Sequence, residues 1–239
     1  MTIIKGLWIG PELSAMEQLS IRSFLANGHE YHLYVYDDVA NVPPGTIIKD
    51  GNEILPASMI FQYKEHKSYS AFSNFFRYKL LFERGGWWCD TDIVCLRPFD
   101  FTEEYVFSSE SGPRGEVIAS GVIRVPPGSQ VMGYAWQICQ QKDVGELRWG
   151  EVGPRLVAEA VKQLSLDRFV HSTETFCPVS YTDWQCVLDG ASVPDFGDST
   201  YAVHLWNEMW RRAGADKNAT YQQSCLFEKL KMVYAARLR

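Results

Sequence analysis

Two aspartates separated by one residue are the side chains of this sequence best suited to chemistry. Asp90 and Asp92 follow the apolar residues 87–89 and flank Thr91. In an extended chain, alternate side chains point to the same side, so both carboxylates can reach one hard cation such as Mg²⁺ or Mn²⁺. Alone, an Asp-x-Asp pair more often supplies hydrogen bonds within a turn. The pair therefore predicts a cation site only together with its surroundings.

A polar stripe precedes the aspartates. Ser70, Ser73, Asn74 and Arg77 are spaced i, i+3, i+4 and i+7 in the helix expected at residues 70–84, so they share one face, opposite a row of phenylalanines. Two consecutive glycines then allow a sharp turn that brings this face beside the carboxylates. We interpret the whole as a cation site next to a pocket of hydrogen-bond donors and acceptors.

Three further side chains are candidate site residues, and each of them also has a purely structural explanation. Trp8, at the end of the first expected strand, can lie against a flat ligand or belong to the core. His204 can be a ligand or a hydrogen-bonded core histidine. Trp206 can line the pocket or pack against Trp210, four residues further on.

The elements that must position these residues alternate along the chain. We expect strands at residues 2–9, 31–36, 87–96, 105–109, 117–125 and 201–205. We expect helices from Pro11 to about residue 28 and at residues 70–84, 129–141, 153–164 and from about 221. This order predicts an α/β fold with helices on both faces of a sheet, in a single domain over residues 1–239.

Composition excludes several classes of protein. With 239 residues, 46% of them apolar, and a net charge of -6, the chain is typical of a globular protein and not of a nucleic-acid binder. It has no apolar run of about 18 residues and no signal-peptide pattern, so we expect a cytoplasmic protein. The six cysteines form no Cys-x-x-Cys pair and are expected to be reduced. A phosphate-bearing ligand must be held by something other than bulk charge.

The end of the chain has the opposite charge. Residues 208–239 carry seven basic and three acidic side chains. Leu226, Leu230 and Val233 are spaced to share one apolar face of the basic helix expected at about 221–239. We expect this helix to pack on the core, and a weak contact with the inner face of an anionic membrane is the alternative.

The central pattern carries a family resemblance. Ser-Asn-x-x-Arg-Tyr at residues 73–78, followed by Gly-Gly-Trp-Trp-x-Asp-Thr-Asp at residues 85–92, resembles the signature of DXD sugar transferases, in particular glycosyltransferase family 32. The similarity extends to Leu-Trp-Ile-Gly at 7–10, Val-Gly-Pro-Arg at 152–155 and His-Leu-Trp-Asn-Glu-Met-Trp at 204–210. Two positions depart from it: many relatives have Asp where this chain has Asn74, and Tyr where it has Trp88. The first departure leaves the donor sugar open.

The resemblance implies a fold and an activity. The fold is the single-domain, Rossmann-like GT-A type, a mixed sheet flanked by helices that binds a nucleotide sugar. The reaction transfers a sugar, with retention of anomeric configuration, from a nucleotide-sugar donor, expected to be a UDP-sugar. The implied acceptor is a saccharide or a lipid-linked saccharide of polysaccharide biosynthesis.

The resemblance also implies site residues. Mn²⁺ or Mg²⁺ would be bound by Asp90, Asp92 and His204, and Arg77 would join the two aspartates as a catalytic residue. The residues implied to bind the donor are Trp8, Ser73, Asn74, Arg77, Asp90, Trp206 and Asn207.

Two other functions fit parts of the pattern. Asp90-x-Asp92 after an apolar strand also resembles the first motif of haloacid-dehalogenase-like phosphatases, in which the first Asp is the nucleophile beside Mg²⁺. That family needs a later Lys and a second acidic motif, for which Asp195 and Asp198 are poor candidates. A calcium-binding module of EF-hand type fails because Val94 occupies a ligand position.

Overall fold

The structure, a computed structural model, describes residues 1–112, 115–191 and 194–236. Its strands are β1 (Ile3–Leu7), β2 (Glu30–Val35), β3 (Ile47–Asp50), β4 (Gly86–Cys89), β5 (Ile93–Cys95), β6 (Val106–Gly112), β7 (Gly115–Val125) and β8 (Ala202–His204). Its α-helices are α1 (Ala15–Ala26), α2 (Ser70–Arg84), α3 (Gln130–Gln140), α4 (Pro154–Gln163), α5 (Thr173–Phe176), α6 (Asn207–Ala213) and α7 (Leu226–Ala236). Short 3-10 helices are η1 (Gly51–Glu53), η2 (Ala57–Met59), η3 (Asp167–Phe169) and η4 (Tyr181–Leu188).

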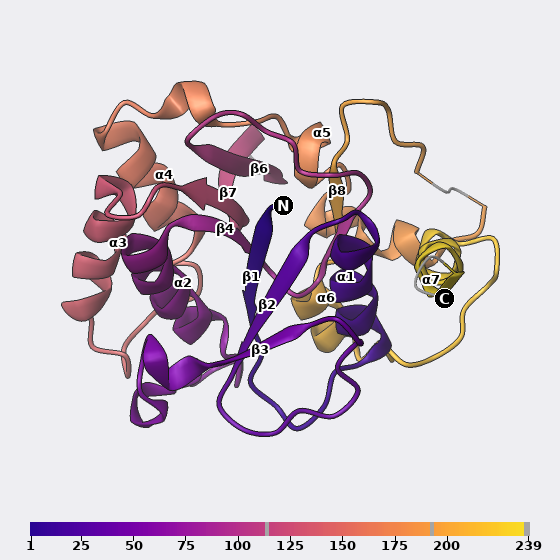
Figure 1. Ribbon diagram of the computed structural model, residues 1–239, viewed down its shortest axis with the longest axis horizontal. Coiled ribbons are helices and arrows are strands. Elements are labelled where there is room, and N and C mark those ends of the chain that lie inside the picture. Colours follow the sequence, from indigo (N-terminus) through magenta and orange to yellow (C-terminus); the bar gives the residue numbers. More distant parts are fainter. Residues whose placement is uncertain (113–114, 192–193, 237–239) are drawn as a thin grey trace.

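The strands form a mixed sheet and a small second sheet. In the described residues the main sheet has the order β3-β2-β1-β4-β7-β6, and its first four strands run parallel. β7 pairs antiparallel with both β4 and β6, and β5 pairs antiparallel with β8 in the second sheet. Figure 1 shows α2, α3 and α4 to the left of the strands and α1 and α7 to the right. The expected α/β fold with a helix-flanked mixed sheet is confirmed.

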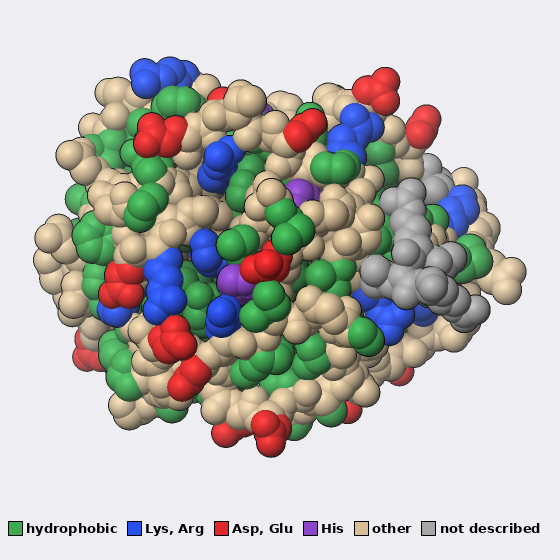
Figure 2. Space-filling view, in the orientation of Figure 1, with side chains coloured by type: hydrophobic (Ala, Val, Ile, Leu, Met, Phe, Trp, Pro, Cys, Tyr) green, Lys and Arg blue, Asp and Glu red, His purple; other side chains and the backbone are tan. Residues whose placement is uncertain are grey.

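The surface mixes both signs of charge. Figure 2 shows acidic and basic side chains next to one another on one face, with hydrophobic side chains between them. No helix in the described ranges is both long and apolar enough to cross a bilayer.

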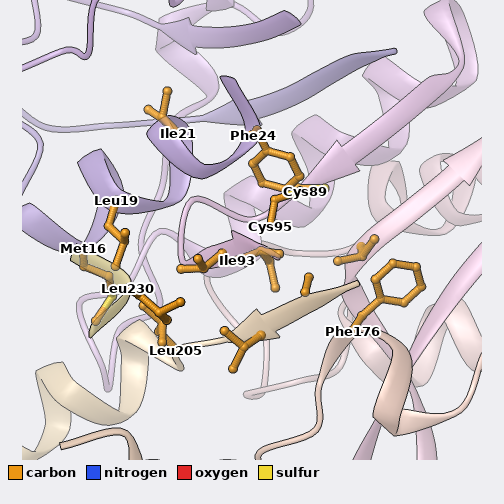
Figure 3. Packing of buried hydrophobic residues seen from close by; sticks show 14 of the residues in the cluster. Met16, Leu19, Ile21, Phe24, Cys89, Ile93, Cys95, Phe176, Leu205 and Leu230 are labelled. Carbon is orange, nitrogen blue, oxygen red and sulfur yellow. The ribbon is translucent and has the colours of Figure 1, made fainter. Parts of the chain in front are cut away.

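The core has a part on each side of the sheet. On one side, the phenylalanines of α2 pack with Trp88 of β4 and Ile123 of β7. On the other side, α1 packs against the second sheet and α7; Figure 3 shows Met16 and Leu19 facing Leu205 and Leu230. α2 and α1 therefore bury their apolar faces against strands, while α7 packs on α1.

The strand expected at residues 87–96 is wrong as one element. The chain turns after Cys89, where the Ile93 N–H donates to the carbonyl oxygen of Asp90 at 3.0 Å. β4 and β5 consequently lie in different sheets. An apolar run shows that both segments are buried, but it does not show where the chain changes sheet.

Two helix boundaries also differ from expectation. α1 begins at Ala15 and not at Pro11, because Ser14 and Glu17 form a capping box. α7 begins at Leu226, and Val233, expected on its apolar face, is 41% exposed. Phe227 and Tyr234 are buried there beside Leu226 and Leu230. The expected extension of this helix over residues 237–239 lies outside the described residues.

Candidate active site

Asp90 and Asp92 lie in the turn from β4 to β5, at the carboxyl end of β4. The Asp90 N–H donates to the carbonyl oxygen of Gly121 on β7 at 2.8 Å. Because the chain is turned here, the strand geometry expected to bring the two carboxylates together is wrong. Both carboxylates nevertheless lie beside His204. Asp92 Oδ2 is 3.1 Å from His204 Nε2, and Asp90 Oδ2 lies with His204 next to Gly121.

Arg77 of α2 is the main partner of Asp90. Its Nη2 atom lies 2.8 Å from Asp90 Oδ1, to which the indole Nε1 of Trp88 also donates at 2.9 Å. The guanidinium is buried, and it donates to Ser73 Oγ at 3.1 Å and to the carbonyl oxygen of Ser120. Burial raises the pKa of the Asp90 carboxyl, while the charge of Arg77 opposes that shift. A cation and an anion are thus fixed together at the edge of the sheet.

The second aspartate has different partners. Asp92 Oδ2 accepts hydrogen bonds from His204 Nε2 at 3.1 Å and from the Asn207 N–H at 2.8 Å. Burial alone would raise the pKa of Asp92, but His204 and these hydrogen bonds lower it overall. Burial also works to lower the pKa of His204, yet the adjacent carboxylate raises it well above its ordinary value. The two side chains form a buried, hydrogen-bonded pair.

Trp206 holds this pair in place. Its backbone is left-handed, with φ 60° and ψ 53°, which is unusual for a bulky side chain. Its ring stacks on His204 with 3.8 Å between centroids, and its Nε1 donates to the carbonyl oxygen of Val179 at 2.8 Å. The sulfur of Cys177 lies 4.0 Å from His204 Nδ1. The left-handed turn lets the imidazole and the first N–H of α6 face the same carboxylate.

Asn74 lies next to this network with an unused acceptor. Its side chain is buried, and its Oδ1 has no hydrogen-bond partner among the described residues. A β-carbon at Gly153 would lie 3.2 Å from Asn74 Nδ2, and the Tyr78 hydroxyl donates to the carbonyl oxygen of Val152 at 2.8 Å. A buried oxygen without a partner is costly unless a ligand donates to it. Asn74 is therefore free to accept a hydrogen bond from a bound molecule.

Trp8 lies apart from the aspartates. It follows β1, which neighbours β4, so both lie at the carboxyl edge of the parallel strands. Its ring contacts Lys217, whose Nζ is 5.4 Å from the ring centroid. In the described part of the chain it has no hydrogen bond or ring contact with Asp90 or Asp92. The structure places the other predicted donor-binding residues in two neighbouring groups. Ser73, Arg77 and Asp90 form one, with Asn74 next to Ser73 in α2. Trp206 and Asn207 belong to the group around Asp92 and His204.

The predicted metal ligands have donor atoms that suit a divalent cation, but they face other protein groups. Within the described ranges, no three His, Cys, Asp or Glu side chains converge on one point. Asp90 faces Arg77, and Asp92 faces His204. Two carboxylates and one imidazole suit Mn²⁺, and the carboxylates suit Mg²⁺. Gly121 leaves room beside them, because a β-carbon there would lie 3.3 Å from Asp90 Oδ2 and 3.7 Å from His204 Cε1.

The sequence did not predict three contributors to this site. Gly121 carries a usable signal, since a glycine inside a strand often marks the close approach of another group. Trp88 also carries one, because it lies two residues before Asp90 along the chain. Cys177 carries no signal that we can identify, as only the tertiary fold brings it to His204.

The geometry does not favour the phosphatase interpretation. Its first aspartate would be a nucleophile, but Asp90 is held by an arginine and an indole. The candidates for its second acidic motif, Asp195 and Asp198, are exposed, and Asp198 pairs with Arg97 at 3.5 Å. Neither makes a contact with Asp90 in the described residues.

Two family models match the chain. The model described as "Glycosyltransferase sugar-binding region containing DXD motif" matches residues 14–108, which include α2 and both aspartates. The model described as "Alpha 1,4-glycosyltransferase conserved region" matches residues 141–230, which include Gly153 and His204. Together they contain the site described above, except for Trp8, Ser120 and Gly121.

A curated human protein and several solved structures, among them the PaToxG and GlyE glycosyltransferases, are similar to the chain. Human alpha-1,4-N-acetylglucosaminyltransferase is 23% identical over 149 residues, which are 56% of this chain and 41% of the human protein. The chain thus spans less than half the length of this relative. The PaToxG glycosyltransferase is 18% identical, with a TM-score of 0.50 over 68% of this chain and 69% of its own. The glycosyltransferase GlyE of Streptococcus pneumoniae TIGR4, in its apo form, is 10% identical, with a TM-score of 0.51 over 99% of this chain and 62% of its own. These structures confirm the expected GT-A fold.

Proposed function

We propose that this chain, a family 32-like glycosyltransferase with a DXD motif, is a metal-dependent retaining enzyme that takes its sugar from a UDP-sugar. The observation that carries the proposal is the pairing of Asp90 with Arg77 and of Asp92 with His204 at one buried edge of the sheet. In open α/β sheets, ligands bind outside the carboxyl ends of the strands, which is where these pairs lie.

The proposed mechanism rests on charge neutralisation. Asp90, Asp92 and His204 would hold Mn²⁺ or Mg²⁺, which when bound acts as a Lewis acid on the phosphates of the leaving nucleotide. Arg77 is fixed by Ser73 and by the carbonyl oxygen of Ser120, so its charge is already oriented before a donor binds. Such preorganised charge stabilises a transition state at little reorganisation cost. The acceptor can attack on the face that the leaving group vacates, which retains the configuration without a protein nucleophile.

The donor would lie across the network on α2 and α6. Asn74 Oδ1, buried and without a partner, would accept a hydrogen bond from a sugar hydroxyl. Ser73, Trp206 and Asn207 would line the same pocket, and Trp8 would lie against the base. Because Asn74 stands where many relatives have Asp, the proposal names no particular sugar.

We also propose an acceptor for the sugar and a cellular location for the reaction. A saccharide or lipid-linked saccharide of polysaccharide biosynthesis is the acceptor that the family resemblance implies, with the reaction in the cytoplasm. The exposed residues Lys229, Met232 and Val233 of α7 would provide weak contact with the inner face of the membrane.

The test is donor binding and turnover. We expect a UDP-sugar to raise the melting temperature and to be hydrolysed only with Mn²⁺ or Mg²⁺. Asp92→Ala removes both a proposed cation ligand and the hydrogen-bond partner of His204, so we expect activity to fall about 100- to 1000-fold. The exposed Asp195→Ala variant is the matched control and should keep full activity.

Two outcomes would contradict the proposal. A folded Asp92→Ala variant with unchanged turnover would remove the cation site. Cleavage of a phosphate ester by a wild-type protein that binds no nucleotide sugar would favour the phosphatase alternative.

A further inference from the structure

The hairpin of β6 and β7 forms a wall of the candidate site. β7 carries Gly121, which lies against Asp90 and His204, and Ser120, whose carbonyl oxygen accepts from Arg77. On β6, Glu110 pairs with Val117 of β7, two pairs from Gly112–Gly115 at the end of the hairpin that extends beyond the carboxyl end of β4. Glu110 is therefore carried by the same two strands that contact the aspartate and the histidine.

A second connection brings Glu110 to the histidine side of the site. Ser180 Oγ contacts the carbonyl oxygen of Ser111, the residue after Glu110, at 3.5 Å. The segment 177–180 also contacts the histidine and the tryptophan: the Cys177 sulfur is 4.0 Å from His204 Nδ1, and the Val179 carbonyl oxygen accepts from Trp206. The end of β6 and the His204 strand are thus tied to one short segment.

The carboxylate of Glu110 has no protein partner. Among the described residues its side chain makes no hydrogen bond or ion pair, although it is partly buried. Burial raises its pKa, and the charges that act on it are those of His204, which opposes the shift, and of Asp90, which adds to it. By contrast, the carboxylate of Glu116 on the facing strand has protein partners, because its Oε1 accepts from Ser109 Oγ at 2.5 Å and from the Thr173 N–H at 2.6 Å.

A carboxylate that is withdrawn from water without a partner costs free energy unless something else interacts with it. Sugar transfer supplies such a partner. As the bond from the anomeric carbon to the phosphate oxygen breaks, the sugar develops positive, oxocarbenium-like charge, while the leaving group takes the electron pair. The bound cation and Arg77 would stabilise the negative charge of the leaving nucleotide. Neither would stabilise the positive charge that develops on the sugar.

We propose that Glu110 is a further catalytic residue, whose carboxylate contacts the transferred sugar and stabilises its developing positive charge. This inference rests on the proposed function, because it requires a donor sugar between the Asp90–Asp92 turn and the β6–β7 hairpin. It assigns no covalent bond to Glu110. It adds to the site a side chain of the β6–β7 hairpin, which lies outside both the sequence motif and the predicted metal ligands.

The test compares Glu110→Gln with Glu116→Gln, using UDP, a UDP-sugar that the wild type hydrolyses, and Mn²⁺. We expect Glu110→Gln to lower kcat about 100-fold while the Kd for UDP and for Mn²⁺ changes less than about threefold. Glu110→Asp should recover part of the rate. Glu116→Gln should lower the melting temperature more than the rate, since its carboxylate has only structural partners.

Each other outcome has a defined meaning. A Glu110→Gln variant with wild-type kcat would overturn the catalytic role and leave the proposed function intact. A loss of Mn²⁺ affinity in the Glu110→Gln variant would also overturn the proposed contact with the sugar, because it would show that Glu110 is a cation ligand. A wild-type protein that binds no nucleotide sugar would overturn the proposed function, and this inference with it.

Discussion

Asp90 and Asp92 have the same side chain but opposite electrostatic surroundings. Both are buried, which disfavours a charged carboxylate. Asp92 gains enough from His204 and from the first N–H of α6 to have a lowered pKa. Asp90 has a raised pKa despite Arg77, because the charge of Asp92 adds to the effect of burial. The same side chain therefore has its pKa shifted in opposite directions at two positions that are two residues apart.

Gly121 lies close to Asp90 and His204, where there is little room for a side chain. Its backbone does not require a left-handed conformation. A β-carbon there would lie 3.3 Å from Asp90 Oδ2 and 3.7 Å from His204 Cε1, so any side chain would crowd these two groups. The glycine thus serves the site by leaving space, and not by turning the chain.

His29 makes a pH-dependent contribution that the structure allows us to predict with its sign. Its ring is buried between Phe24 and Phe99, and its Nε2 accepts a hydrogen bond from the Phe99 N–H at 3.0 Å. Burial lowers its pKa below the ordinary 6.5. The unfolded chain therefore takes up a proton near pH 6.5, whereas the folded chain does so only at lower pH. The folded state must lose stability as the pH falls below about 6.5.

The check is the free energy of unfolding in urea at pH 7.5 and pH 5.5, for the wild type and for His29→Gln. We expect the wild type to lose up to about 1 kcal/mol more than the variant over this interval. Subtracting the two profiles removes the contribution of His204, whose raised pKa acts in the opposite direction. Parallel profiles would show that His29 does not titrate differently in the folded protein.

At the scale of elements, sequence periodicity located some boundaries and missed others for physical reasons. α2 was predicted at its observed bounds, because a strong apolar spacing ends at two glycines. β3 was missed because Ile47 and Ile48 are exposed and do not alternate with polar residues. α6 was missed because the residue before it, Trp206, is left-handed and supplies no side-chain cap.

The site was predictable to the extent that it is local in sequence. Arg77 and Asp90 were placed together correctly, since they belong to one helix and the strand that follows it. Glu110 and Gly121 come from strands at the antiparallel end of the sheet, with a register shift within β6–β7, and Cys177 follows α5. No spacing in one sequence encodes that register.

The start of α1 offers a prediction about a single element. Ser14 Oγ accepts from the Met16 N–H at 3.3 Å, and Glu17 Oε2 accepts from the Ser14 N–H at 2.8 Å. Ser14→Ala removes half of this capping box, and we expect it to lower the free energy of unfolding by about 1 kcal/mol. Ser199→Ala, at an exposed serine without a capping role, should stay within about 0.5 kcal/mol of the wild type.

Chemical denaturation of both serine variants provides the measurement. Equal effects of the two substitutions would mean that the capping box contributes nothing to stability. The buried carboxylate of Glu17 also binds Lys217 at 2.5 Å, so α1 is fixed to the C-terminal segment as well as to its own first turn.

At the scale of the molecule, the C-terminal segment packs over α1 while it keeps an outer face. Asn218 Oδ1 accepts from the Ala15 N–H at 2.9 Å, and Leu226 and Leu230 belong to the same buried cluster as α1. Met232, at 54% exposed, and Val233 remain on the outside beside Lys229. The helix is therefore both a part of the core and an exposed, basic, partly apolar strip, on a chain whose net charge is -6.

This strip predicts weak binding to anionic membranes and none to neutral ones. Each basic side chain near an anionic surface contributes about 1 kcal/mol, and the strip adds two exposed apolar side chains. We expect replacement of four basic residues by Gln to reduce partitioning onto phosphatidylserine vesicles at least about tenfold, as measured by co-sedimentation. The four are Lys229, Lys231, Arg237 and Arg239.

The effect of net charge on vesicle binding must be separated from the effect of residue position, because replacing four basic residues by Gln makes the protein four charges more negative. A control with the same charge change on other elements replaces Lys49, Lys64, Lys162 and Arg168. If binding depends on the face of α7, the control keeps its affinity apart from a small, uniform loss at low salt. If both variants lose binding equally, or the wild type does not bind, α7 is only a structural helix and the enzyme must meet its acceptor without membrane contact.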